Sequence, residues 1–86
     1  MPPAPAVIHD AVVDILKDVS RRPIEPTLEH DLVADLGFDS LQVLETIAAL
    51  EDRFDISVPA AEVQSTRTVG QVIARVGALV EARPSV

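Results

Sequence analysis

The sequence predicts an all-α domain, a small four-helix bundle of three main helices plus one short helix, with a long loop between helices 1 and 2. Two observations support this class. The seven prolines leave the windows 6–22, 27–58 and 60–83 free of proline, and proline inside a helix removes a hydrogen bond and clashes with the preceding turn. Within these windows, apolar residues recur at helical spacing.

The first window predicts a helix with one apolar face and one charged face. Arg21 and Arg22 follow its last turn, where cations suit the negative end of the helix dipole. The apolar face carries Val7, Ile8, Ala11, Val12, Ile15, Leu16 and Val19, and the opposite face carries Asp10, Asp14, Lys17 and Asp18.

The middle window is too long and too interrupted for one helix. Residues 28–38 contain apolar residues without helical continuity, and we expect a long structured loop there. Loops of this length usually have a function. Its expected apolar anchors are Leu28, Leu32, Val33, Leu36 and Phe38.

A second helix is predicted to follow, with Asp39 as its N-cap and Gln42 three residues later. Residues 55–58 alternate and should run extended before Pro59, and residues 60–65 could form one short helical turn. The expected apolar stripe of the second helix is Leu41, Leu44, Ile47, Ala48 and Leu50, followed by Phe54.

The last window predicts a third main helix. Thr68 and Gln71 fit a capping box. Gly70 and Gly77 weaken this helix by about 1 kcal/mol each relative to alanine, so either they allow close packing or tertiary contacts hold the helix. The apolar stripe is Val69, Val72, Ile73, Val76, Leu79 and Val80.

Length and composition narrow the function. We expect one domain over residues 1–86, with flexible tails at 1–5 and 83–86. A net charge of −7 argues against a nucleic-acid binder. Cysteine is absent, and no apolar run approaches the roughly 20 residues of a membrane span. The first residues lack the basic start and apolar stretch of a signal peptide. We therefore expect a cytoplasmic monomer.

The acidic residues are concentrated in one part of the chain. Residues 23–64 carry ten acids and one base, Arg53. This cluster is either a solvated face that keeps a small protein soluble or a recognition surface for partners with basic patches. On charge alone the solvated face is favoured.

The common catalytic and metal-binding patterns are absent. His9 and His30 lie far apart and have no cysteine to complete a zinc site. A calcium loop starting at Asp31 or Asp35 would place the wrong residues at the ligand and glycine positions. Ser40 does not lie in a G-x-S-x-G elbow, and no glycine-rich phosphate loop is present. We expect no catalytic residue and no metal.

Ser40 remains as the candidate site. As the first residue of the predicted second helix it has its hydroxyl near unpaired backbone N–H groups and the positive end of the helix dipole, which suits a phosphate. Gly37 lets the backbone turn sharply before it and leaves the hydroxyl open to an incoming active site. Serine near a helix start is common, so only the flanking sequence can distinguish a functional site from an ordinary helix start.

That pattern reads DLVADLGFDSL over residues 31–41, then LEDRF at 50–54 and ISVP at 56–59. It resembles the acyl carrier protein family, with its D-L-G-x-D-S-L stretch, L-E-x-x-F segment and I-x-I/V-P turn. Thr68 and Val69 match the T-V that opens the family's last helix. The resemblance runs from about Thr27 to Val76.

The resemblance implies that Ser40, flanked by Gly37, Asp39 and Leu41, receives 4′-phosphopantetheine from coenzyme A through a phosphopantetheinyl transferase. The terminal thiol of this arm would carry an acyl or aminoacyl group as a thioester, so the protein would present cargo to loading and transferring enzymes rather than catalyse. The implied partner-contact residues are Leu41, Leu44, Glu45, Ala48, Glu51 and Asp52.

Several departures from the family pattern leave the pathway open. Gln42 replaces an acid, Ala60 and Ala61 replace Asp and Glu, and Ala48 replaces a larger apolar residue that is frequent there. The pathway could therefore be fatty acid synthesis or polyketide, peptide-type, modified-lipid or stand-alone aminoacyl metabolism. A function of a different class is an unmodified acidic interaction module, which the intact Asp39-Ser40-Leu41 disfavours.

Overall fold

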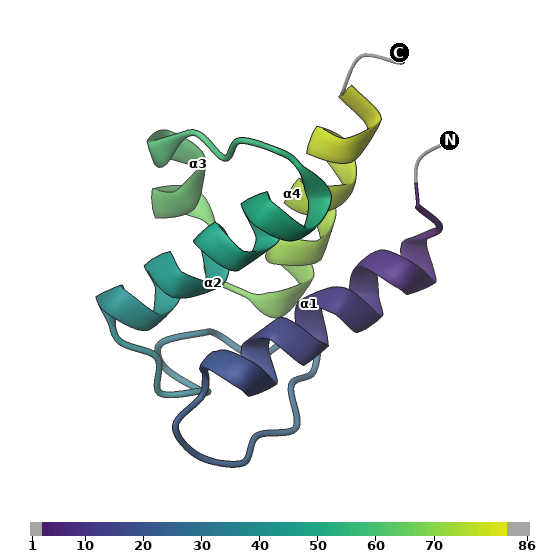
Figure 1. Ribbon diagram of the computed structural model, residues 1–86. Coiled ribbons are helices and arrows are strands. Elements are labelled where there is room, and N and C mark those ends of the chain that lie inside the picture. The colour runs from purple at the N-terminus through teal and green to yellow at the C-terminus, as the bar shows by residue number, and fades with distance from the viewer. Residues whose placement is uncertain (1–2, 83–86) are drawn as a thin grey trace.

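The computed structural model describes residues 3–82, which contain four helices. These are α1 (Pro5–Val19), α2 (Ser40–Phe54), α3 (Ala60–Ser65) and α4 (Val69–Ala82). The predicted all-α bundle, with a short third helix and a long loop after the first, is confirmed (Figure 1). Of the predicted tails, residues 1–2 and 83–86 lie outside the described residues.

Helix α1 begins at Pro5, inside the segment predicted as a tail. Proline is tolerated there because the N–H of the first helical residue has no partner within the helix. The helix buries five of its predicted face residues, but Val7 is exposed and Val19 is only partly buried. The five buried residues are Ile8, Ala11, Val12, Ile15 and Leu16.

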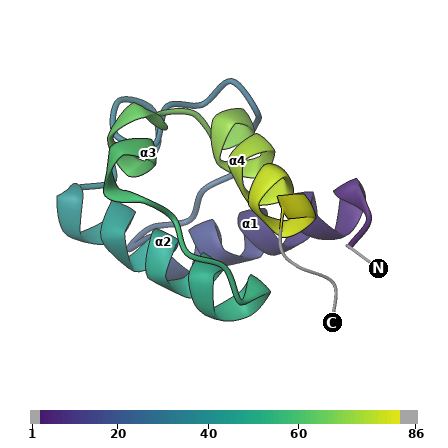
Figure 2. The same ribbon diagram turned by 90° about the horizontal axis from the view of Figure 1, so that it is seen from above.

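Helix α1 packs against both α2 and α4. Helix α3 lies on the side of the bundle away from α1, beside α2 and α4 (Figure 2), and it buries none of its residues. The core therefore lies between the three long helices and the first loop. Within residues 3–82, no helix is long and apolar enough to cross a membrane.

The predicted capping box of α4 is present. The Gln71 N–H donates to the Thr68 hydroxyl (3.2 Å), and the Thr68 N–H donates to Gln71 Oε1 (3.1 Å). The two glycines of this helix differ. A methyl group on Gly70 would lie 3.2 Å from the Leu28 carbonyl oxygen, so Gly70 allows a close approach, whereas Gly77 has more space. The buried residues are Val69, Val72, Val76 and Val80, with Ile73 and Leu79 partly buried.

The buried face of α2 differs from the predicted apolar stripe. Leu41 and Leu44 are each 58% exposed, Ala48 is exposed and Ile47 is only partly buried. Burial of polar groups that have hydrogen-bond partners explains the error, since the Thr46 hydroxyl donates to the Gln42 carbonyl (2.9 Å). The buried residues of α2 are Gln42, Thr46, Leu50 and Phe54.

The loop between α1 and α2 is fastened to the start of α4 by backbone hydrogen bonds. The Leu32 N–H donates to the Arg67 carbonyl (2.9 Å), and the Val69 N–H donates to the His30 carbonyl (3.0 Å). Of the predicted anchors, Leu32, Leu36 and Phe38 are buried, but Leu28 and Val33 are exposed. These two predictions were wrong because backbone bonding, rather than apolar burial, holds this part of the loop.

The segment after α2 also departs from expectation at its first residue. Asp55 adopts the left-handed conformation (φ 53°) and caps the end of α2, so it is not extended. Residues 56–59 form neither helix nor strand. The short helix predicted at 60–65 is confirmed as α3.

Candidate attachment site

Ser40 is the first residue of α2 and is exposed. The helix begins there because Asp39 and Gln42 form a capping box: the Gln42 N–H donates to Asp39 Oδ1 (2.8 Å) and the Asp39 N–H donates to Gln42 Oε1 (3.1 Å). Within residues 3–82 the N–H groups of Ser40 and Leu41 have no protein acceptor. Two donors and the positive end of the helix dipole therefore face the space near the serine hydroxyl.

Gly37 turns the chain toward this helix start. Its φ of 75° lies in the left-handed region that favours glycine. Any Cβ here would also lie 2.9 Å from Nη2 of Arg22, which donates to the Leu36 carbonyl (3.3 Å). The predicted role of Gly37 as a sharp turn before the serine agrees with this geometry.

Arg21 adds a cation beside the helix start. Its Nη1 lies 3.9 Å from Oδ2 of Asp39, and both side chains are well exposed. An exposed pair at this distance contributes little to stability. The pair places the Arg21 guanidinium beside Asp39, the residue that precedes Ser40.

A groove with a volume of about 580 Å³ opens beside Ser40. It lies between the first loop, α2 and α3, and aliphatic side chains form much of its lining. Polar side chains stand among them, with Arg67 as the cation. The lining residues are Asp31, Leu32, Val33, Ser40, Val43, Leu44, Val63, Gln64, Thr66 and Arg67.

Asp31 organises the loop wall of this groove. Its Oδ1 accepts hydrogen bonds from the N–H groups of Ala34 and Val33 (2.9 Å each), and Oδ2 lies 3.4 Å from Nε of Arg67. The bonds from Ala34 and Val33, reinforced by the Arg67 charge, hold the pKa of the Asp31 carboxyl below its usual range. The carboxylate therefore stays charged and fixes the turn at neutral pH.

The implied partner-contact residues divide into two groups. Five are exposed and fall on one face of α2, given 100° per residue. Glu51 differs, because its Oε2 accepts the Val58 N–H (2.8 Å) and holds the segment after the helix. The five exposed residues are Leu41, Leu44, Glu45, Ala48 and Asp52.

Sequence reasoning missed the far wall of the groove. Val63, Thr66 and Arg67 come from α3 and the turn after it, and the sequence offered no signal beyond the T-V match that follows them. His9 Nδ1 lies 3.0 Å from Asp10 Oδ1, and His30 Nδ1 accepts the Thr27 N–H (3.1 Å). The described residues contain no group of side chains that could hold a metal ion.

The fold and the site together define a small helical bundle with an exposed serine at a helix start beside a groove with aliphatic lining. A family model described as the phosphopantetheine attachment site matches residues 10–76. An acyl carrier protein of Amoebophilus asiaticus is 45% identical over 67 residues, covering 77% of this chain and 84% of that protein. The meromycolate extension acyl carrier protein of Mycobacterium bovis is 33% identical over 85 residues, covering 98% of this chain and 74% of that protein.

A solved structure described as an acyl carrier protein from Mycobacterium tuberculosis aligns with a TM-score of 0.79 at 35% identity, covering 83% of this chain and 96% of that chain. The chain belongs to the acyl carrier protein family. It is a carrier rather than an enzyme, its cofactor is covalent 4′-phosphopantetheine, and it works with a phosphopantetheinyl transferase and biosynthetic enzymes.

The residues at the start of α2 fit a covalently attached 4′-phosphopantetheine. A phosphodiester on Ser40 would lie near the unpaired N–H groups of Ser40 and Leu41, donors that suit an anion. The groove beside it offers aliphatic surface to an arm or its cargo. When bound, the group supplies a terminal thiol, which forms the thioester and accounts for a carrier without cysteine.

Proposed function

We propose that Ser40 carries the 4′-phosphopantetheine arm and that the protein presents an acyl group to partner enzymes. The observation that carries the proposal is the exposed Ser40 at the first position of α2, lining an aliphatic groove. An unmodified interaction module would need neither the open hydroxyl nor the groove beside it.

The chain's own residues have separate tasks in this function. Asp39 and Gln42 hold the helix start, so the serine hydroxyl keeps one position for the transferase. Gly37 turns the chain before the serine in a left-handed conformation that favours glycine. The N–H groups of Ser40 and Leu41 favour the negative charge of the phosphodiester.

The partner surface is proposed as the exposed face of α2. Leu41 and Leu44 give it apolar contact area, and Glu45 and Asp52 give it negative charge. Such a face would steer enzymes with basic patches toward Ser40. Ala48 lies on the same face, whereas Glu51 serves mainly to hold the segment after α2.

The cargo is proposed as a lipid-type acyl chain rather than an amino acid or peptide. Leu32, Val43 and Val63 in the groove suit methylene groups better than the charged amine of an aminoacyl group. A relative that aligns with 98% of this chain is named for meromycolate extension, which supports a role in extending or modifying acyl chains. Stand-alone aminoacyl transfer is the alternative. We also propose a cytoplasmic monomer, which fractionation and sedimentation would test.

The site is tested with a broad-specificity phosphopantetheinyl transferase and coenzyme A. Intact mass should show one added phosphopantetheine group, located on Ser40 by peptide mapping. Ser40→Ala should abolish the addition, whereas Ser57→Ala, at an exposed serine beyond the other end of α2, should leave it unchanged. Modification of the Ser40→Ala protein would overturn the site assignment.

A further inference from the structure

The chain that leaves α1 contacts the turn that carries Ser40. Residues 19–22 meet residues 36–42, which form the attachment turn, at three points spread along it. The contacts are a hydrogen bond from Nη2 of Arg22 to the Leu36 carbonyl (3.3 Å), the pair Arg21–Asp39 at 3.9 Å, and a hydrogen bond from Nε2 of Gln42 to the Val19 carbonyl (3.3 Å). The end of α1 therefore supports the attachment turn both before and after the serine.

Arg22 is the residue that reaches the turn before the serine. Its guanidinium group fills the space that a side chain on residue 37 would need, because a Cβ there would lie 2.9 Å from Nη2, 3.5 Å from Cζ and 3.9 Å from Nε. Gly37 has a φ of 75° and lies three residues before Ser40. Glycine restrains its own backbone least of all residues, so the direction of the chain here depends on neighbouring groups.

The peptide between Leu36 and Gly37 is held on both sides, from two different parts of the chain. The Gly37 N–H donates to the Val33 carbonyl (3.1 Å), a bond within the loop. The Leu36 carbonyl accepts from Arg22, which lies 14 positions earlier. The arginine is itself fixed by Ser20, whose hydroxyl donates to the Arg22 carbonyl (2.6 Å) and accepts the Arg22 N–H (3.3 Å). The loop bond therefore fixes one side of this peptide, and Arg22 fixes the other.

We propose that Arg22 is a positioning residue for the modification of Ser40. By holding the Leu36–Gly37 peptide, it keeps the attachment turn in the conformation that the transferase binds, and it acts through Gly37 rather than on the serine hydroxyl. This inference rests on the proposed attachment at Ser40. When only a fraction of a protein is in the binding-competent conformation, its apparent affinity falls by that fraction. Loss of Arg22 should therefore raise the KM of the transferase for the carrier and leave kcat unchanged.

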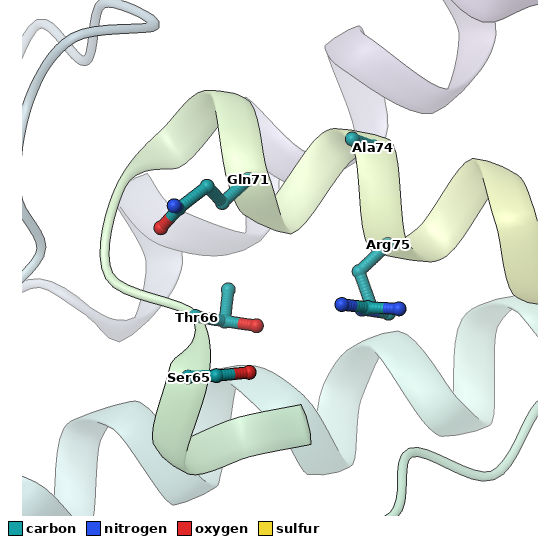
Figure 3. A pocket seen from close by; sticks show the side chains of 5 residues that line it. All are labelled: Ser65, Thr66, Gln71, Ala74 and Arg75. Carbon is teal, nitrogen blue, oxygen red and sulfur yellow. The ribbon is translucent and has the colours of Figure 1, made fainter. Parts of the chain in front are cut away.

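Arg75 provides a comparison, because it also makes a defined hydrogen bond but lies elsewhere in the fold. Figure 3 shows its guanidinium group reaching from α4 toward α3, at a pocket with a volume of about 250 Å³. Nη1 of Arg75 donates to Glu62 Oε1 (2.9 Å), so this arginine ties the two helices together. The residues that line the pocket all fall within 65–75, outside the attachment turn. Arg75→Gln therefore removes an arginine contact that supports the fold but not the turn.

The test measures kcat and KM of a broad-specificity phosphopantetheinyl transferase for the carrier, at saturating coenzyme A and well below the melting temperature. Arg22→Gln should raise KM about twofold to fivefold at unchanged kcat. This is less than the factor of roughly ten that one hydrogen bond can give, because the Gly37 N–H bond remains. Arg75→Gln should lower the melting temperature and leave KM unchanged. Lys17→Gln, which removes an exposed cation from the last turn of α1, should also leave KM unchanged.

A second readout uses the carrier alone. NMR relaxation dispersion should detect microsecond-to-millisecond exchange at the amides of residues 37–41 in Arg22→Gln. The wild type, Arg75→Gln and Lys17→Gln should show none there. A merely structural role of Arg22 would lower the melting temperature without producing this local exchange.

The proposal is overturned if the KM of Arg22→Gln rises no more than that of Arg75→Gln, or if its amides at 37–41 show no exchange. It is also overturned if the KM difference vanishes at high salt, because Arg22 would then act as a docking charge on the transferase encounter. The Ser40 assignment fails in a different way, as an addition that persists in Ser40→Ala, whatever the Arg22 variant does.

Discussion

Nε2 of Gln42 lies 3.3 Å from the carbonyl oxygen of Val19, and this hydrogen bond joins the start of α2 to the end of α1. Gln42 is almost fully buried. The other polar atom of its side-chain amide, Oε1, accepts the Asp39 N–H. One amide thus caps the helix that presents Ser40 and positions it against the rest of the bundle. An acid at this position could still accept the Asp39 N–H but could not donate to the Val19 carbonyl, since a carboxylate has no N–H.

Gln42→Glu should therefore destabilise the fold by about 1–3 kcal/mol, because it removes the donor to Val19 and places a carboxylate against a carbonyl oxygen. Urea unfolding at neutral pH measures the change. Gln64→Glu, an exposed position on α3, controls for the added charge and should stay within about 0.5 kcal/mol of the wild type. If Gln42→Glu were as stable as the wild type, the bond to Val19 would carry no stability.

Asp31→Asn should change how stability depends on pH. The folded pKa of Asp31 is lowered, so the contribution of its carboxylate is present above the unfolded value of about 3.9 and is lost as pH falls through the folded pKa. The wild type should exceed the variant in stability most at neutral pH, and the gap should close in acid. Denaturant unfolding at several pH values tests this, with Asp14→Asn on the exposed face of α1 as the control for a lost charge. A gap that widened in acid would contradict the argument.

Glu45→Lys should leave the fold nearly intact, within about 0.5 kcal/mol, since Glu45 is exposed on α2. It should slow modification by the transferase in a salt-dependent way, because a rim charge acts mainly on the encounter rate. Leu50→Ala, at a fully buried position of the same helix, should instead cost roughly 2–5 kcal/mol. Circular dichroism melts and modification rates at two salt concentrations separate the two effects. An unchanged rate for Glu45→Lys would remove this residue from the partner surface.

The two glycines of α4 should respond differently to alanine. At Gly77 the new methyl group would lie 4.0 Å from Cδ1 of Ile8, an ordinary contact, so the better helix propensity should stabilise the protein by about 0.5–1 kcal/mol. At Gly70 the methyl group would press on the Leu28 carbonyl, which accepts the Gly70 N–H at 3.0 Å. We expect no gain there. Thermal melts of both variants measure the difference. Equal stabilisation would show that the loop at Leu28 moves away from the new methyl group at little cost.

The features that depend on neighbouring residues were predictable from the sequence. The helix windows, the capping boxes at Asp39 and Thr68, and the short α3 all follow from proline placement, periodicity and side chains within four residues of each other. The position of Ser40 at a helix start and the family resemblance likewise needed only the linear pattern. Such signals are local, so they survive without knowledge of the fold.

Tertiary structure alone decided which way α2 faces. Leu41 and Leu44 are apolar yet exposed, and Gln42 and Thr46 are polar yet buried, because burial of a polar group costs little once a partner accepts its hydrogen bonds. One partner of Gln42, the Val19 carbonyl, is 23 residues away. The groove beside Ser40 and the pocket at Arg75 have the same origin, since each combines loop or helix segments that only packing brings together.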